Sequence, residues 1–430
     1  MKNIVLILLL AFALGASAQT AKQEIAARPT LSASNHAAYP YPAQPLPRLT
    51  AAPAGYEPFY IDHYGRHGSR WSTKSSAYGW PASQLEKAQR NHCLTAKGEQ
   101  VLAVLRKGVE AGYKRTGELS DVGAEQHQGI AARMYRNFPQ VFAGDAQVEA
   151  RSTIIIRCIL SMINETNTLK GLNPRLRVHA DASVHDMPWM GWGYGEDTLA
   201  VPLRKRMDRY SDSAVAANVH PERLMRVLFS DQNFVADSIK AKKLMSSLFD
   251  VAGLLQNHHA FDRQNLLNLF TKQELYDLWR AQNVYWYVHW ANAPQNGNRM
   301  PYIERGLLQN MVATADSMIV RGGHGADLRF GHETCLLPLA CIMELDGVNQ
   351  SVSDLSKLER QWVNYRIFPM GCNVQLIFYR KPGAPVLVKA LLNEREVTLP
   401  VSTTQFPYYK WSDLREYYIK KLATPIDWTK

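Results

Sequence analysis

The feature that most constrains this chain is a short apolar run followed by a glycine-interrupted basic loop, within FYIDHYGRHGSRW. Phe59, Tyr60 and Ile61 predict a short buried strand. Gly65 and Gly68 predict that the strand gives way to a loop in which the backbone can approach a ligand closely. We therefore expect a binding loop immediately after a buried strand.

The predicted loop places one histidine between two arginines. Arg66 and Arg70 each offer a planar fork of donors that suits phosphate oxygens. His67 can be neutral near pH 7 and so can act as a nucleophile. A solvated basic loop with a packed imidazole is the alternative. The complete R-H-G-x-R pattern after a strand favours a nucleophile that attacks an anion held by guanidinium groups.

A second strand-to-helix turn is predicted in VEARSTIIIRCILSM. The run from Val148 to Ala150 predicts the end of a strand, and Ser152 or Thr153 is expected to cap the helix that follows. Arg157 then falls in the first turns, where the helix dipole favours an anion. A salt bridge between this arginine and a core carboxylate is the alternative.

A third turn of the same kind is predicted in ADLRFGHETCLLPLACIMELDG. Leu328 to Phe330 predicts a strand, and His332-Glu333-Thr334 lies in the turn before a helix. A capping turn with an incidental His-Glu pair is the alternative. In an open α/β sheet, such turns meet at the carboxyl ends of the strands, where ligands bind.

The segment RHGSRWSTK resembles the signature of the histidine phosphatase superfamily, in its acid phosphatase and phytase branch. The overall likeness is greatest to bacterial relatives of multiple inositol polyphosphate phosphatase, in scattered blocks between about residues 55 and 345. The resemblance implies a phosphohistidine mechanism that needs no metal and no cofactor. The implied roles are nucleophile for His67, acid and then base for Glu333, phosphate binding for Arg66, Arg70, Arg157 and His332, and weaker substrate contacts for Lys74 and Arg151.

The chain departs from the family pattern in its third turn. Acid phosphatases carry histidine followed by aspartate here, and the inositol polyphosphate branch carries His-Ala-Glu. This chain has His332-Glu333-Thr334, so its carboxyl group takes the place of the aspartate on a side chain one methylene longer. The second turn also departs, because Ile154 and Ile156 stand where relatives often carry acidic residues.

The N-terminus has the pattern of an export signal. Lys2, an apolar run from Ile4 to Leu14 and the sequence Ala16-Ser17-Ala18 predict a signal peptide over residues 1–18. The apolar run is too short to span a bilayer, and no later stretch is long and apolar enough to do so. We expect an exported protein, periplasmic or secreted, without a membrane span in the mature chain.

Four further segments follow from composition and periodicity in this chain of 430 residues. Residues 19–54 form a Pro/Ala-rich leader, expected to lie extended on the surface or to be partly disordered. Residues 55–185 and 302–430 are expected to form an α/β phosphatase core, and residues 186–301 a mostly helical cap. The predicted fold class is therefore α/β, a mixed-sheet three-layer sandwich with an inserted helical cap domain.

The net charge indicates the kind of partner that the chain binds, and the cysteine count bears on disulfides. Lys and Arg exceed Asp and Glu by 49 − 38 = 11, and loss of Lys2 with the signal leaves +10, which favours an anionic partner. We expect a phosphorylated small molecule rather than nucleic acid, and nothing in the sequence specifies an oligomeric state. The five cysteines are expected to be mostly buried free thiols.

The predicted function is hydrolysis of phosphomonoesters, with inositol polyphosphates as the expected substrates. A broad-specificity acid phosphatase or a sugar-phosphate phosphatase remains an alternative. A mutase that returns the phosphoryl group to an acceptor is a further one. The non-enzymatic alternative is an exported protein whose basic and aromatic residues bind nucleic acid or glycans.

Overall fold

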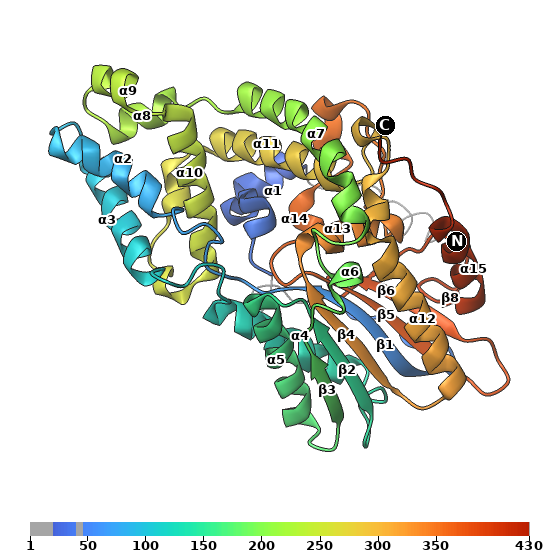
Figure 1. Ribbon diagram of the computed structural model, residues 1–430. Helices are drawn as coiled ribbons and strands as arrows, with labels where there is room; N and C mark the ends of the chain where they lie inside the picture. Colours follow the sequence, from blue (N-terminus) through green and yellow to red (C-terminus); the bar gives the residue numbers. More distant parts are fainter. Residues whose placement is uncertain (1–19, 40–45, 430) are drawn as a thin grey trace, which may run out of the picture.

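In the computed structural model, residues 20–39 and 46–429 are described, and their strands form a single mixed sheet (Figure 1). The predicted signal peptide, residues 1–18, lies outside the described residues. The strand order is β3-β2-β4-β1-β5-β6-β7, with β8 paired to β6. The strands are β1 (Glu57–Arg66), β2 (Gln147–Ser152), β3 (Arg177–Asp181), β4 (Gly325–Gly331), β5 (Asn373–Arg380), β6 (Leu387–Leu392), β7 (Arg395–Val397) and β8 (Tyr409–Lys410).

The parallel half of the sheet brings the three predicted turns to one edge. Strands β3, β2, β4 and β1 run parallel, whereas β5 is antiparallel to β1 and begins the hairpin with β6. Arg66 pairs with Gly331, and Ser152 pairs with Phe330, so β1, β2 and β4 end side by side. The loops that follow these strands therefore start at the same level.

Helices cover both faces of the sheet, which confirms the predicted three-layer α/β architecture. On one face, α4 (Asp121–Asn137) and α5 (Ile156–Leu172) pack on apolar side chains such as Ile61 and Phe330. On the other face, α12 (Arg305–Arg321) and α15 (Trp411–Leu422) share a core with Phe378. The alternation of side chains along each strand supplies both faces.

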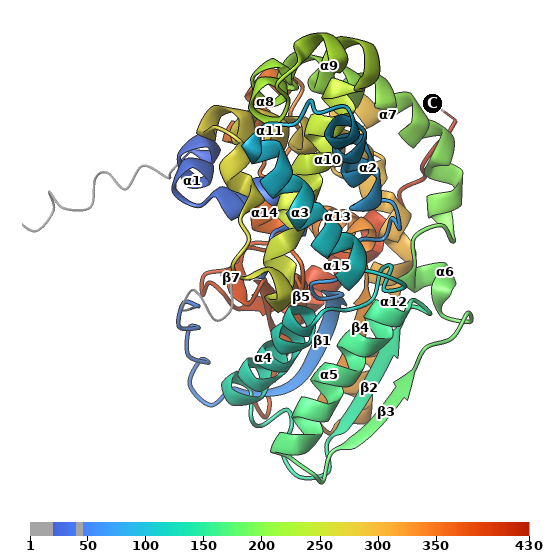
Figure 2. The ribbon, with the colours of Figure 1, turned by 90° about the vertical axis from the view of Figure 1, so that its left-hand side faces the viewer.

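A large helical half lies beyond the carboxyl ends of the parallel strands (Figures 1 and 2). The chain from 186 to 301 supplies most of it, and the segment 79–111 packs into the same apolar cluster through residues such as Leu85 and Leu105. The remaining helices are α2 (Gly79–Arg90), α3 (Ala96–Ala111), α6 (Met187–Met190), α7 (Glu196–Asn218), α8 (Glu222–Leu228), α9 (Gln232–Ser238), α10 (Ala241–Leu254), α11 (Lys272–Trp290), α13 (Glu333–Ile342) and α14 (Asn364–Ile367). Short 3-10 turns over 255–257, 259–261, 266–269, 294–296, 300–304 and 355–360 connect them.

Residues 20–39 of the N-terminal leader are folded, so the prediction of an extended or disordered segment is wrong for them. Thr20 and Gln23 form a capping box that starts α1 (Ala21–Ala27), and Pro29 opens the 3-10 helix η1 (Pro29–His36). Ile25 is fully buried in the core of the helical half. Helices α1 and η1 therefore pack as part of the helical half.

The structure tests the predictions for the helix caps, the cysteines and membrane-spanning helices. Thr95 and Ser120 cap α3 and α4 through their side chains, but α5 is capped by Ile155 without a side-chain hydrogen bond, so the prediction of Ser152 or Thr153 is wrong. The five cysteines are all buried and free. Within residues 20–39 and 46–429, no helix combines the length and the apolar character needed to cross a bilayer.

A buried ion pair holds α12 to the sheet. Arg329 of β4 and Asp62 of β1 pair with each other, and their side chains are 1% and 0% exposed. The same guanidinium donates to the Asn310 amide oxygen at 2.8 Å and to the Thr314 hydroxyl at 3.0 Å, both on α12. Because Arg329 lies three residues before His332, this pair fixes the strand that carries the third turn.

Replacing Arg329 with methionine is expected to lower the free energy of unfolding by about 3–5 kcal/mol, because Asp62 would remain buried without its cation. Urea denaturation followed by circular dichroism measures this change. Arg415→Met is the matched control, because its pair with Asp316 is partly exposed, and a cost of about 0–1 kcal/mol is expected. Equal costs for the two variants would contradict the account.

Candidate active site

The three turns bring the predicted chemistry together at the carboxyl edge of the sheet. Arg66 is the last residue of β1, and Arg157 is the second residue of α5, which follows β2. His332 caps α13 after β4, and Glu333 begins that helix. Nitrogen and oxygen atoms of His67, His332 and Glu333 all lie within 4.8 Å of one another.

His67 presents an unprotonated ring nitrogen to this cluster. Its Nδ1 lies 2.9 Å from the carbonyl oxygen of Gly68, and because a carbonyl can only accept, Nδ1 carries the hydrogen. Burial, reinforced by Arg157 and Arg66, lowers the pKa of His67 well below its usual range. The ring is therefore neutral, with the lone pair of Nε2 available as a nucleophile.

The loop that carries His67 is fixed by close packing on α4 and α5. A Cβ on Gly68 would lie 2.5 Å from the carbonyl oxygen of Gly123, so only glycine fits this contact. The amide of Gly68 donates to Ser161 Oγ at 3.1 Å, and the amide of Ser69 donates to Gln126 Oε1 at 2.8 Å. These contacts hold His67 in one place.

Arg66 and Glu333 form a buried ion pair beside His67. Arg66 Nη2 lies 2.9 Å from Glu333 Oε1, and Glu333 Oε2 lies 3.7 Å from His67 Nε2. Burial by itself would raise the pKa of Glu333, but Arg66 and Arg70 outweigh burial and hold it well below its usual range. Glu333 is thus a carboxylate in the free protein.

The second histidine also faces the cluster as a neutral ring. Arg157 Nη2 donates to His332 Nδ1 at 3.4 Å, which leaves the hydrogen on Nε2, 3.4 Å from the Thr153 hydroxyl. Burial and the charge of Arg157 lower the pKa of His332 to about 3. His332 therefore offers one N–H donor to the site.

Unpaired donors indicate that the site binds an anion. The Nε groups of Arg66, Arg70 and Arg157 are buried and have no hydrogen-bond acceptor among the described residues. Buried donors without acceptors are costly, and an anion with several oxygens would satisfy them. His67, His332 and Glu333 offer a ligand set for a metal ion, but the three adjacent guanidinium groups repel a cation.

The two weaker candidates for substrate contact, Arg151 and Lys74, lie in different surroundings. Arg151 pairs with Asp327 at 3.3 Å and with Glu149 at 3.4 Å, so carboxylates outside the cluster engage its guanidinium. Lys74 is exposed on the loop after β1. Burial lowers the pKa of His36, and the charges of Arg70, Arg66 and Lys74 lower it further. Lys74 thus lies on the loop that also carries Arg70, and Arg151 lies apart from the cluster.

One contributor to the site was missed by the sequence analysis. Asn35 of η1 donates from Nδ2 to Glu333 Oε1 at 3.0 Å, and its carbonyl oxygen accepts from Arg66 Nη1 at 2.6 Å. The only local signal is a polar Asn-His pair within an otherwise small-residue stretch, SASNHAA. That signal matches no catalytic motif.

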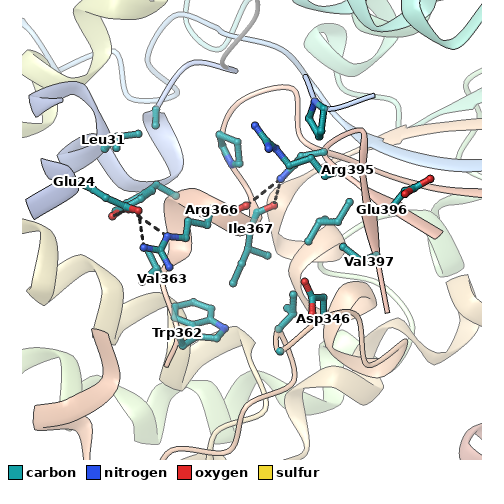
Figure 3. Close-up of a pocket in the computed structure, with 18 of the residues that line it drawn as sticks. Glu24, Leu31, Asp346, Trp362, Val363, Arg366, Ile367, Arg395, Glu396 and Val397 are labelled. Atoms are coloured by element: carbon teal, nitrogen blue, oxygen red, sulfur yellow. Dashed lines mark hydrogen bonds and ion pairs between the residues drawn. The ribbon is translucent and has the colours of Figure 1, made fainter. Parts of the chain in front are cut away.

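A cavity of about 1100 Å³ is lined in part by residues of α1 and η1, and Figure 3 shows the side chains around it. Trp362, Ile367 and Val397 line it, and Arg366 pairs with Glu24 at 2.7 Å at its edge. None of the predicted catalytic or phosphate-binding residues contributes to its wall. The candidate chemistry therefore lies elsewhere.

Known structures share this fold. No protein-family model matches the sequence, and no curated protein matches it significantly. The multiple inositol polyphosphate phosphatase of Bifidobacterium longum, solved with inositol hexasulfate, is 18% identical over 90% of this chain and 97% of its own, with a TM-score of 0.73. The phytase of D. castellii is 15% identical over 92% of this chain and 85% of its own, with a TM-score of 0.67. The resemblance suggested by RHGSR is confirmed at the level of structure: the chain has the histidine acid phosphatase fold.

Proposed function

We propose that the protein hydrolyses phosphomonoesters through a phosphohistidine on His67. The observation that carries this proposal is the neutral ring of His67, with Nε2 free, beside buried guanidinium donors that lack acceptors. An anionic phosphorus centre would otherwise repel a nucleophile, and the arginines remove that barrier while stabilising the charge of the transition state.

The reaction has two steps. In the first, His67 Nε2 bonds to phosphorus as the bond to the leaving oxygen breaks, and Glu333 gives that oxygen a proton. In the second, the Glu333 carboxylate takes a proton from water, the water oxygen bonds to phosphorus, and the bond to Nε2 breaks. Arg66, Arg70, Arg157 and His332 hold the phosphoryl oxygens throughout.

The ionised state of Glu333 in the free protein is compatible with its role as an acid. Arg66 and Arg70 keep its pKa low. A bound phosphoryl group offsets the charge of the same two arginines, so the pKa of Glu333 rises when substrate binds. A monoanionic ester carries the needed proton into the site, which favours activity at acidic pH.

Hydrolysis of 4-nitrophenyl phosphate in the presence of a chelator tests the proposed activity. Turnover without added metal supports the phosphohistidine mechanism and excludes a protein that only binds nucleic acid or glycans. Adding alcohol acceptors then tests the mutase alternative, in which phosphate appears on the acceptor rather than as free phosphate. No hydrolysis under any of these conditions would refute the proposal.

We further propose that the enzyme is exported and that inositol polyphosphates are its substrates. The N-terminal signal pattern supports export, which fractionation of cells can test. The mature charge of +10 and the exposed Lys74, on the loop that carries Arg70, favour a polyanion. The relative from Bifidobacterium longum was solved with inositol hexasulfate. A sugar phosphate remains the second candidate, because His332-Glu333-Thr334 departs from the His-Ala-Glu pattern.

The substrate class has a direct test in kcat/KM for inositol hexakisphosphate against glucose 1-phosphate. We expect the polyanion to be preferred, and Lys74→Ala to reduce that preference by about fivefold to tenfold, an effect that weakens as salt is raised. Lys410→Ala removes the same charge from an exposed position on β8 and is expected to leave the preference unchanged. A preference for the monophosphate that changes neither with salt concentration nor with Lys74→Ala would indicate a general acid phosphatase.

A further inference from the structure

The two carboxylate oxygens of Glu333 have different surroundings. Oε1 accepts a hydrogen bond from the side-chain amide of Asn35 at 3.0 Å and lies 2.9 Å from Arg66 Nη2 in an ion pair. Oε2 faces His67 Nε2 at 3.7 Å. One oxygen thus lies against two donors, and the other lies on the side where the nucleophile meets phosphorus.

Asn35 is held firmly enough to impose this difference. It is buried, and its carbonyl oxygen accepts from Arg66 Nη1 at 2.6 Å. Before it, Ser34 turns the chain at a φ of 59° and accepts from Asn364 Nδ2 at 2.6 Å. After it, the carbonyl of His36 accepts from Asn257 Nδ2 at 2.9 Å. The segment is therefore fixed on both sides of the amide.

We propose that Asn35 is a positioning residue that makes Oε2 the oxygen of Glu333 that carries and delivers the catalytic proton. The inference rests on the proposed phosphatase function. A proton on Oε1 would meet the N–H of Asn35, donor against donor, and the positive guanidinium of Arg66, whereas no side chain of the described residues donates a hydrogen bond to Oε2. When the phosphorus–oxygen bond breaks, the proton on Oε2 passes to the leaving oxygen and Glu333 becomes a carboxylate.

Asn35 is an uncharged residue among the charged and titratable groups that surround Glu333. Arg66 and Arg70 favour the ionised carboxylate, and His332 acts in the same direction. The other titratable groups that interact with Glu333 are His67, His36 of η1, Cys158 of α5, Tyr285 of α11 and Cys372 before β5. None of these occupies the position of Asn35, whose amide alone joins Arg66 at Oε1 among the described contacts.

The test compares Asn35→Asp and Asn35→Ala with the wild type. Asn35→Asp keeps the shape of the side chain but places a second carboxyl group against Oε1. The two carboxyl groups then share a proton at Oε1, the oxygen that does not face the leaving group. We expect kcat/KM to fall on the order of tenfold for an alkyl phosphate and by about threefold or less for 4-nitrophenyl phosphate. The alkaline limb of the kcat profile should move to higher pH by about one unit, because the added negative charge disfavours a second one. Asn35→Ala, which lacks the donor, should change both quantities in the same direction and by less.

Ser32→Ala is the matched control. Ser32 is fully buried in the same 3-10 helix and donates to the carbonyl of Pro29 at 2.7 Å, without contact to Glu333. It should reduce thermal stability comparably while leaving the alkyl-to-aryl ratio and the pH profile as in wild type. If the Asn35 variants match Ser32→Ala in both readouts, the residue is only structural and the inference is wrong.

The outcomes also separate this inference from the proposed function. A wild-type protein that hydrolyses no phosphomonoester, or that carries phosphate on a residue other than His67, overturns both. A wild-type protein that forms phosphate on His67, together with Asn35 variants that lose equally on both substrates and keep the wild-type pH profile, overturns the inference alone.

Discussion

Replacing His67 with alanine is expected to abolish turnover, with a loss on the order of 10⁴-fold or more, because the nucleophile forms the covalent intermediate. The fold should survive, since the only hydrogen bond of the ring among the described residues goes to the neighbouring carbonyl of Gly68. Kinetics on 4-nitrophenyl phosphate and a thermal unfolding curve measure the two effects. His259→Ala, which removes an exposed histidine bound to Glu125, should retain full activity.

Trapping the intermediate makes this prediction specific. Labelled phosphate captured during turnover should be acid-labile, as a phosphohistidine is, and should map to His67 in the wild type. The label should be absent from His67→Ala. Label on another side chain, or a variant that still turns over at the wild-type rate, would show that His67 is not the nucleophile.

The parts of the site that could be predicted from sequence are those carried by local pattern. An apolar run that ends in a turn recurs before Arg66, Arg157 and His332, and at the last two a helical repeat follows, so each pattern can be recognised within about fifteen residues. The parallel register then brings the three ends together without further information, because parallel strands in one sheet share a carboxyl edge. The three-layer architecture follows from the same alternation.

The parts that could not be predicted depend on contacts between distant segments. Asn35 and Glu333 are 298 residues apart, and no periodicity links a small-residue leader to a helix start. Arg151 illustrates the opposite error, because it matched a family position but lies one residue before the end of β2. Side chains alternate along a strand, so its guanidinium follows the face that carries Asp327 and not the turn.

The other large effect is expected for Glu333→Gln, and it should depend on the leaving group. An alkoxide needs a proton to depart and a nitrophenolate needs little. We expect kcat/KM to fall about 10²-fold to 10³-fold for an alkyl phosphate and by about tenfold or less for 4-nitrophenyl phosphate. The first chemical step governs kcat/KM, so this ratio isolates the acid role.

The second step should suffer on both substrates, because water is no longer deprotonated by the Glu333 carboxylate. With 4-nitrophenyl phosphate, the variant should therefore release a burst of nitrophenolate and accumulate phosphate on His67. Glu333→Ala tests whether the new amide of the glutamine variant merely blocks His67 Nε2, which lies 3.7 Å from Oε2 in the wild type. Glu333→Asp restores a carboxyl group one methylene shorter and should recover much of the activity toward alkyl phosphates. Equal losses on both substrates, without a burst, would assign the proton to a different group and leave Glu333 as the partner that holds Arg66 in place.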